Sequence, residues 1–251
     1  MLIRHIPHSS THIPKPYREH FLIDEHELNN EVLRLTDWYT DELFADSDSE
    51  EVRFPVSRIV CDPERFLHDK HEPASQVGMG VFYTHGTKGQ LIRSLDDALQ
   101  RKIINEFYLP HHNKLTAKVT ESLKQRGKAF ILDCHSFPTD PLPTEDRFET
   151  SRPDFCIGFD DFHVPYEVIH ECESLLQGKG FTVSINTPYA GCLIPSVFYG
   201  IDARVRGLMI EVNRRLYMDE TSGEKSDQFD RIQEMVKNCI IQPIKNALAK
   251  Y

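Results

Sequence analysis

The sequence lacks a long apolar stretch, and this absence sets the first limits on the protein. No apolar run approaches the roughly 20 residues that a membrane-spanning helix needs. The first residues, MLIRHIPHSS, lack the apolar centre and the small-residue cleavage site of a secretion signal. Hydrophobic residues make up 39% of the 251 residues, which is enough for one large domain with a sizeable core. We therefore expect a single cytoplasmic domain over residues 1–251 with no membrane partner.

Basic residues are also scarce. The chain has 29 lysines and arginines against 39 aspartates and glutamates, a net charge of -10. Nucleic-acid binding needs a basic surface that can neutralise phosphates. The composition therefore argues against a nucleic acid as the main partner.

The six cysteines are widely spaced, and no C-x-x-C pair occurs. We expect reduced, buried thiols and no disulfide framework. Cys134 stands next to His135, which raises the alternative of a thiol nucleophile. Adjacent residues of a strand point to opposite faces, however, and this disfavours a Cys134–His135 pair. The cysteines are Cys61, Cys134, Cys156, Cys172, Cys192 and Cys239.

Short apolar runs alternate with amphipathic segments along the chain. The runs predict strands that are covered on both faces, at 2–6, 54–60, 128–134, 154–159, 181–185 and 207–212. Helical spacing of apolar residues predicts helices at 25–44, 94–127, 166–180 and 226–251, with a kink or break at Pro110. Strands that alternate with helices predict an α/β fold with a mostly parallel sheet.

Polar side chains stand where these predicted strands end. His8 follows the first strand, His135 ends the strand of FILDC, and Glu211 lies inside GLMIEVNR. Asp37 lies in the predicted helix LTDWYTDELF. Ligands of open α/β sheets bind at the carboxyl ends of the strands. Two imidazoles and a carboxylate could hold Zn²⁺ with one position open, and a further carboxylate could act as general base, which is the arrangement of metal-assisted hydrolysis.

Glu211 is the single residue that most strongly indicates a functional site. An unpaired carboxylate in a buried strand costs several kcal/mol, so it needs a partner or a chemical role. The structural alternative is a buried ion pair with Arg206 or Arg214.

The other residues have structural alternatives as well. His8 could be only a polar group at a strand end. Asp37 could lie on the solvated face of its helix, since Asp41 follows one turn later. His135 is the better candidate of the two histidines, because Asp133 lies two residues earlier on the same face and could orient an imidazole.

Taken together, several segments resemble the N-formylglutamate amidohydrolase (deformylase) family in order and spacing. They are IPHSSTHIP (6–14), LTDWYTDELF (35–44), VSRIVCDPERF (56–66), YLPHHNKL (108–115), ILDCHSF (131–137), RPDFCIG (152–158), NTPYAGCLIP (186–195) and GLMIEVNRRLYMDE (207–220). Two positions depart from the family pattern: Ser10 and Cys192 stand where the family usually has glycine.

The resemblance implies a fold and a metal site. The family is similar to the zinc-dependent exopeptidases, which implies a three-layer αβα sandwich around a mostly parallel mixed sheet. It implies one Zn²⁺ or similar divalent ion per chain, with His8, Asp37 and His135 as ligands and Glu211 as general base.

The resemblance also implies a substrate, an N-acyl amino acid. The reference reaction is hydrolysis of N-formyl-L-glutamate to glutamate and formate, a step of histidine degradation. Arginines bind carboxylates through two parallel hydrogen bonds, so we expect substrate contacts from residues in or beside the family-like segments: Arg58, Arg65, Arg152, Arg204, Tyr189 and His112. The proline-rich loop 136–153 is expected to cover the site. The alternatives are a zinc amidase for another acyl amino acid or a cell-wall peptide, and a non-catalytic binding protein.

Overall fold

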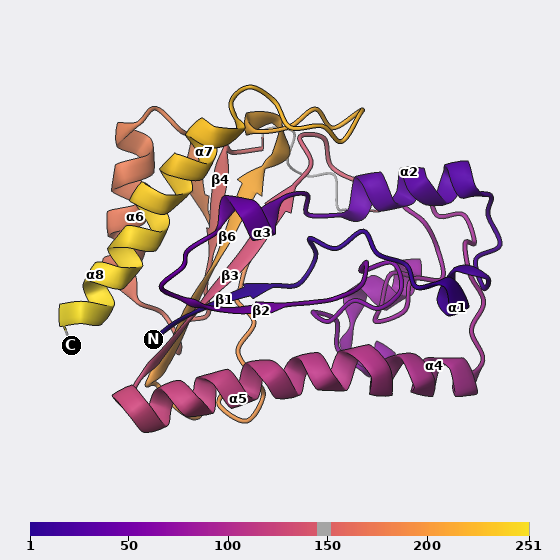
Figure 1. Cartoon of the computed structure of the whole chain (residues 1–251), viewed down its shortest axis with the longest axis horizontal. Helices are drawn as coiled ribbons and strands as arrows, with labels where there is room; N and C mark the ends of the chain where they lie inside the picture. Colours follow the sequence, from indigo (N-terminus) through magenta and orange to yellow (C-terminus); the bar gives the residue numbers. More distant parts are fainter. Residues whose placement is uncertain (145–151, 251) are drawn as a thin grey trace.

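A six-stranded sheet forms the centre of the structure, a computed structural model that describes residues 1–144 and 152–250 (Figure 1). Its strands are β1 (Leu2–Ile6), β2 (Glu50–Arg53), β3 (Ala129–Phe137), β4 (Phe155–Gly158), β5 (Val183–Ile185) and β6 (Val205–Asn213), in the order β2-β1-β3-β6-β4-β5. All neighbouring strands are parallel except β4 and β6. The prediction of an α/β fold with a mostly parallel sheet is confirmed.

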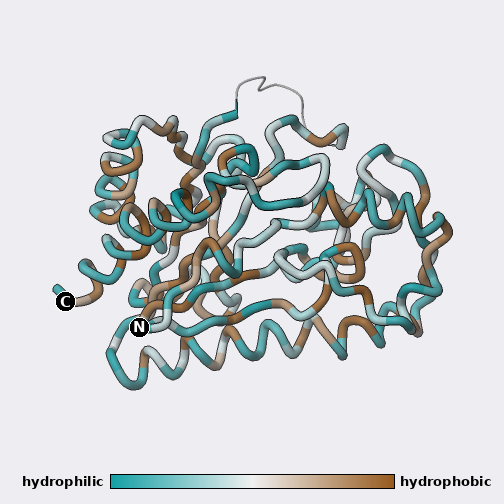
Figure 2. The backbone as a smooth tube through the Cα atoms, turned by 45° about the horizontal axis from the view of Figure 1, so that its top comes forward, coloured by the Kyte–Doolittle hydropathy of each residue, from teal (hydrophilic) through white to brown (hydrophobic). Residues whose placement is uncertain are grey.

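Helices cover both faces of this sheet. One face packs against α3 (Thr40–Leu43), α6 (Tyr166–Gly178), α7 (Phe229–Val236) and α8 (Gln242–Lys250). The long helix α5 (Leu109–Arg126) runs beneath the other face (Figure 1). In Figure 2 the outer helices alternate between hydrophilic and hydrophobic residues, as expected for helices with one face on a core.

The face that α5 covers changes from apolar to polar along the strands. Toward the amino ends of the strands, three residues pack against α5: Ile3, Ile131 and Val205. Because side chains of a strand alternate between faces, residues two, four and six positions further on share this face. There the sheet carries four buried ionisable side chains: His5, Asp133, His135 and Glu211. The polar group therefore lies toward the carboxyl edge of the parallel strands.

A second hydrophobic cluster, formed by residues between 13 and 108, lies beside the sheet. It includes residues of α1 (Lys15–Arg18), α2 (Glu25–Leu35) and α4 (Asp97–Ile103). The short helix η2 (Pro73–Val77) packs against it through Ala74, and η1 (Asp69–His71) contacts η2. The predicted strand at 54–60 is wrong, since these residues form turns after Phe54. They are apolar because they are buried in this cluster, and Pro55 has no N–H for a sheet ladder.

The predicted helix at 25–44 is interrupted. It ends as α2 at Leu35 and resumes as α3 at Thr40, with Tyr39 in the left-handed region at φ 62°. The break is fixed by a hydrogen bond from the Asp37 N–H to the carbonyl oxygen of His8, 3.0 Å long. The turn thereby places Asp37 beside the chain that leaves β1.

Pro110 does not end its helix. The chain stays helical from α4 through the π-turn η3 (Ile104–Tyr108) into α5, where Pro110 lies in the first turn. The same device joins α7 to α8 through the π-turn η5 (Lys237–Ile241), which precedes Pro243. A proline lacks the N–H of the helical ladder and clashes with the preceding turn, and a wider turn accommodates both effects.

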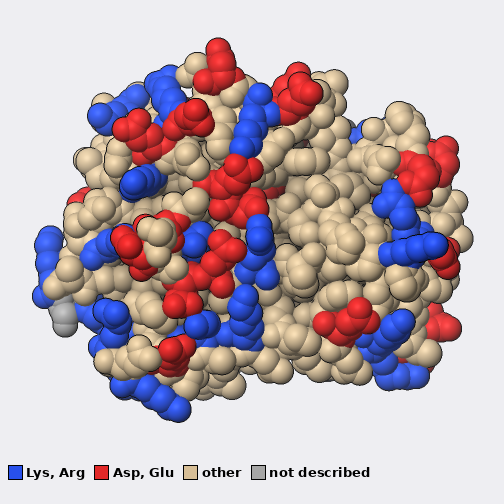
Figure 3. All heavy atoms as spheres, in the orientation of Figure 1, with Lys and Arg blue, Asp and Glu red and all other residues tan. Residues whose placement is uncertain are grey.

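Other expectations concern the surface and the thiols. None of the helices described is long and apolar enough to cross a membrane. The face in Figure 3 shows acidic and basic side chains intermixed. All six cysteines are free thiols, and only Cys192 is partly exposed. Cys134 packs in the core on the face opposite His135. Residues 145–151 of the loop expected to cover the site lie outside the described residues.

Candidate metal centre

The structure brings together the four residues predicted to form the active site. His135 on β3 and Glu211 on β6 are directly paired in the sheet register. His8 lies two residues beyond β1, and Asp37 lies in the turn after α2. Each of these side chains is at most 7% exposed. The residues thus come from four separate segments to one buried point at the edge of the sheet.

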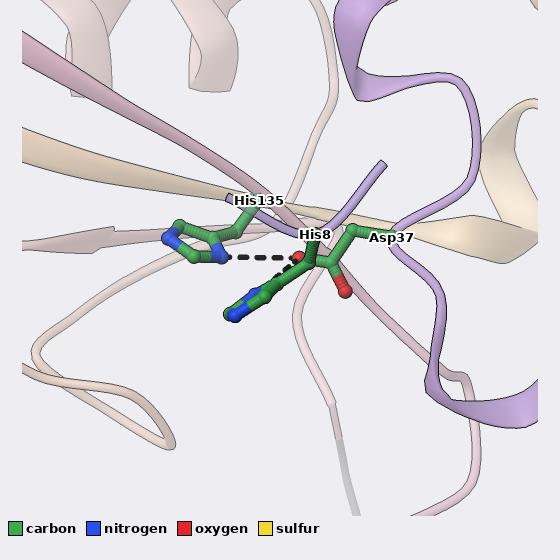
Figure 4. Close-up of side chains that lie close together, drawn as sticks. All are labelled: His8, Asp37 and His135. Atoms are coloured by element: carbon green, nitrogen blue, oxygen red, sulfur yellow. Dashed lines mark hydrogen bonds and ion pairs between the residues drawn. The ribbon is translucent and has the colours of Figure 1, made fainter. Parts of the chain in front are cut away.

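His8, Asp37 and His135 form the centre of this arrangement. Oδ2 of Asp37 lies 3.0 Å from Nδ1 of His135 and 3.5 Å from Nδ1 of His8 (Figure 4). The three ligand atoms all lie within 4.8 Å of one another. Donors that share one ion at about 2.0–2.2 Å are at most about 4.4 Å apart. Both distances to Asp37 are within that limit.

A neighbouring carboxylate orients the ring of His8. Nε2 of His8 lies 2.8 Å from Oδ1 of Asp62, which is fully buried. Burial alone would raise the pKa of Asp62, but Arg58 and His8 hold it well below its usual range. Asp62 is therefore the acceptor, and Nε2 of His8 carries the proton. In the neutral ring, Nδ1 of His8, which has no hydrogen-bond partner, then carries the lone pair and faces the centre.

Asp37 is held from its other side. Its Oδ1 accepts a hydrogen bond of 3.2 Å from Nη2 of Arg214 and lies 3.7 Å from Nη1 of Arg58. The backbone N–H of Ser136 donates to Oδ2 over 3.3 Å. Burial opposes ionisation, yet His135 and His8 lower the pKa of Asp37. The side chain is thus an anchored carboxylate.

Glu211 has a different environment. Its Oε2 is buried without a hydrogen-bond partner. Burial raises the pKa of Glu211 to about 8, and the charges of Asp37 and Glu64 act in the same direction. The guanidinium of Arg214 bonds to Asp37, Ser136 and Arg34, and Arg206 is exposed. Among the residues described, Glu211 has no ion pair with either arginine, so the structural alternative for it receives no support.

These side chains fit a divalent metal ion. Two imidazole nitrogens and one carboxylate oxygen are the ligand set of a hydrolytic zinc site that keeps a position open. The free Nδ1 of His8 and the anchored Oδ2 of Asp37 meet that requirement. Asp62 supplies the carboxylate that commonly orients a metal-binding histidine.

Comparison with known proteins agrees with this architecture. The family model described as N-formylglutamate amidohydrolase matches residues 1–218. The chain belongs to the N-formylglutamate amidohydrolase family. By its family it is an amidohydrolase, as predicted. None of the curated proteins compared with the chain matches it.

Two solved structures share the fold of this family member. One is an N-formylglutamate amidohydrolase from Ralstonia eutropha, with a TM-score of 0.86 and 22% identity, over 99% of this chain and 94% of that one. The other is a gene product from Agrobacterium tumefaciens, with a TM-score of 0.62 and 17% identity, over 97% of this chain and 91% of that one. At these identities the likeness establishes the fold.

Two of the arginines predicted to bind substrate lie beside the centre. Arg58 donates to Asp62 from Nη2 over 2.8 Å and is largely buried. Arg65 is more exposed, and its Nε lies 3.6 Å from Asp62. Both guanidinium groups are thus directed at the carboxylate that orients His8.

Arg152 and Tyr189 form a separate group at the same edge of the sheet. Nη1 of Arg152 donates to the Tyr189 hydroxyl over 2.6 Å. The guanidinium lies 5.6 Å from the ring centre of Phe137, two residues after His135 in β3. Since Phe137 pairs with the last residue of β6, this group lies close to the end of the strand that carries Glu211.

The structure corrects the prediction for Arg204. This residue precedes the first residue of β6, whereas Glu211 lies near the end of that strand. The side chain is 62% exposed and pairs with Asp202. Its place at the opposite edge of the sheet excludes it from the site. His112 donates from Nε2 to the carbonyl oxygen of Pro63 over 2.8 Å and stacks on Tyr108, so it ties α5 to the segment that carries Asp62.

Several residues of the site were not predicted. His5, Asp62, Glu64, His111 and Arg214 all lie at or around the centre. His5 shares a strand face with Ile3, and a period-two reading of LIRHI would have identified it as a buried imidazole. No signal in the sequence places Glu64, since it depends on how the segment after residue 54 folds over the sheet.

Proposed function

We propose that the chain hydrolyses N-formyl-L-glutamate to L-glutamate and formate, with one tightly bound divalent ion, Zn²⁺ in the first instance, held by His8, Asp37 and His135. The observation that carries this proposal is the convergence of these three side chains with Glu211 at one buried point in a chain of the amidohydrolase family. We further propose that the chain is a single cytoplasmic domain related in fold to the zinc-dependent exopeptidases.

The metal ion and Glu211 would have separate roles in the reaction. When bound, the ion would polarise the acyl carbonyl and make a water molecule more acidic. Glu211 accepts the proton of the attacking water at Oε2, the oxygen that has no other partner, and passes it to the leaving amine. In the metal-free protein, burial raises the pKa of Glu211 to about 8, so the carboxylate has a higher proton affinity than an ordinary glutamate. A dication close by would favour its charged form.

Arg152 is the best candidate to bind a carboxylate of the substrate. Its guanidinium lies against the rings of Phe137 and Tyr189, which fix its plane. A planar guanidinium can bind a carboxylate through two hydrogen bonds. Arg58 and Arg65 lie instead against Asp62, the carboxylate that orients His8.

The test combines metal analysis with product detection on the same preparation. We expect about one tightly bound divalent ion per chain and formate release from N-formyl-L-glutamate. N-acetyl-L-aspartate and a cell-wall peptide serve as competing substrates. A folded, metal-loaded protein that releases no formate but cleaves one of these would overturn the substrate while leaving the metal site intact.

A further inference from the structure

A second group of possible ligands lies next to the first. Nδ1 of His5 is 2.7 Å from Oδ1 of Asp133 and 3.6 Å from Oε1 of Glu64. The ligand atoms of these three residues lie within 4.8 Å of one another. His5 and Asp133 are paired in the sheet register. Glu64 comes from the segment that follows Cys61 of the second hydrophobic cluster. None of these residues is needed to hold the first ion.

The charge of this group is poorly compensated. Asp133 is 1% exposed and Glu64 is 17% exposed in its side chain. In the described part of the chain, neither carboxylate has a lysine or arginine within ion-pair distance. Their charged partners are imidazoles, and the backbone N–H of Leu193 donates to Oδ2 of Asp133 over 2.9 Å. By contrast, Asp37 pairs with Arg214, and Asp62 pairs with Arg58. A buried carboxylate without a cation is costly. This group therefore lacks the permanent positive charge that Asp37 and Asp62 have beside them.

A buried nitrogen points into the same space. Nε2 of His135 lies 3.2 Å from Asp133 Oδ1 and 3.2 Å from Glu64 Oε2. Its orientation makes no hydrogen bond with either oxygen, although the residue is only 3% exposed. His135 therefore stands between the two groups, with Nδ1 toward Asp37 and Nε2 toward the carboxylates of Asp133 and Glu64.

His5 can offer a lone pair in one of its two tautomers. Its Nδ1 lies 2.7 Å from Oδ1 of Asp133, so without an ion this nitrogen carries the proton and donates it to the carboxylate. Its Nε2 lies 2.8 Å from Nε2 of His111, which can accept a hydrogen bond in the other tautomer. With the proton on Nε2, Nδ1 of His5 is free to bind a cation.

From these contacts we infer that His5, Glu64 and Asp133 form a second divalent cation site, which binds more weakly than the site of His8, Asp37 and His135. One imidazole and two carboxylates suit ions that accept mixed nitrogen and oxygen ligands, such as Mn²⁺, Co²⁺ or Zn²⁺. Both distances to His5 are within the limit of about 4.4 Å for donors that share an ion. The partly exposed Glu64 gives the ion a path from solvent.

Metal stoichiometry tests this inference without reference to any substrate. The purified protein is dialysed against increasing free Mn²⁺, from micromolar to millimolar, and the bound ions are counted. We expect about two ions per chain at saturation and about one at the lowest concentrations. His5→Gln and Glu64→Gln should each bind about one ion throughout. His20→Gln, which changes an exposed histidine far from these contacts, should behave as the wild type.

Each other outcome overturns the inference. Binding of a single ion by the wild type across the whole range would show that His5 and Asp133 only hydrogen-bond. Two ions in both His5→Gln and Glu64→Gln would place the second ion elsewhere. Loss of both ions in a folded Glu64→Gln protein would show one shared site. Electron paramagnetic resonance adds a direct criterion. Two Mn²⁺ ions in adjacent sites should show magnetic coupling, and spectra of two isolated ions would contradict the inference. Failure of the substrate proposal would leave these stoichiometries unchanged.

Discussion

Arg214 and Asp37 form a buried ion pair between segments that are 177 residues apart in the sequence. Nη2 of Arg214 bonds to Oδ1 of Asp37, and the same guanidinium donates to the carbonyl oxygen of Arg34 at 2.7 Å. It therefore joins the end of α2 to the end of β6. With Oδ1 occupied in this way, Oδ2 is the oxygen that faces His8 and His135.

Replacing Arg214 should weaken metal binding. Arg214→Lys keeps the positive charge but cannot reach Asp37, Arg34 and Ser136 with one planar group. Loss of such an orienting contact typically lowers metal affinity about 10–100-fold. Competition with a chelator measures the affinity, and thermal unfolding in excess chelator shows whether the metal-free fold persists. Arg215→Lys is the matched control, since Arg215 is the next residue in the sequence and its side chain pairs with Asp154 instead. Equal affinities in the two variants would mean that Arg214 does not orient Asp37.

Replacing a ligand should remove the tight ion. In His8→Gln and His135→Gln, the amide is a weaker metal ligand than imidazole, so the tightly bound ion and the hydrolytic activity should both be lost. Elemental analysis and formate release measure the two effects on one sample. His170→Gln is the control, because that histidine is 77% exposed on α6. Full metal occupancy in His135→Gln would disprove the ligand assignment.

The sequence predicts the part of the site that the sheet carries. His8, His135 and Glu211 stand at or near the ends of apolar runs, and parallel strands bring such ends together. The alternation of Leu208, Ile210 and Glu211 in β6 also follows from the strand period. These positions depend on local pattern, which a sequence displays directly.

The remaining part depends on a segment whose fold has no short-range signal. Asp62 and Glu64 follow residues 54–60, an apolar run that predicts a strand but forms turns. Its residues are apolar because a second cluster buries them, and burial alone does not distinguish a turn from a strand. Asp37 was predicted inside a continuous helix, but a hydrogen bond to His8 stabilises the break that directs it inward. Such tertiary contacts override local helix propensity.

Arg152 should affect substrate binding more than metal binding. Arg152→Lys removes the planar guanidinium that stacks between Phe137 and Tyr189. Hydrogen bonds to charged groups contribute about 1.5–3 kcal/mol, so kcat/KM for N-formyl-L-glutamate should fall about 10–100-fold with the metal retained. Steady-state kinetics measure the fall. Arg204→Lys, at the opposite edge of the sheet, should leave the kinetics unchanged. Normal kinetics in Arg152→Lys would mean that Arg152 does not bind the substrate carboxylate, and Arg58 and Arg65 would be the remaining candidates.

Glu211→Gln should separate catalysis from folding. The amide keeps the size and polarity of the side chain but cannot accept a proton, and general-base catalysis is typically worth about 10²–10⁴-fold. The variant should retain its metal and lose turnover by about this factor. Metal content and turnover are measured on the same preparation. Near wild-type turnover in the folded, metal-loaded variant would disprove the general-base assignment. Asp37 would then be the alternative general base.

The same substitution should change how stability depends on pH. In the metal-free protein, the pKa of Glu211 is about 8, against an ordinary value of 4.5. Between these pH values the folded state retains a proton that the unfolded state has released. The free energy of unfolding therefore falls as pH rises through this window. A glutamine does not titrate, so Glu211→Gln should gain stability relative to the wild type between about pH 5 and pH 8.

Denaturant unfolding in excess chelator, at several pH values, measures this difference. The pKa values of Asp37, Asp62 and Asp133 are lowered by their partners, so their contribution to stability is lost only at acidic pH, below this window. Adding a divalent ion should flatten the wild-type slope, because a dication favours the charged carboxylate. A stability difference that stays constant from pH 5 to pH 8 would contradict the raised pKa and, with it, the view that Glu211 is an unpaired buried carboxyl group.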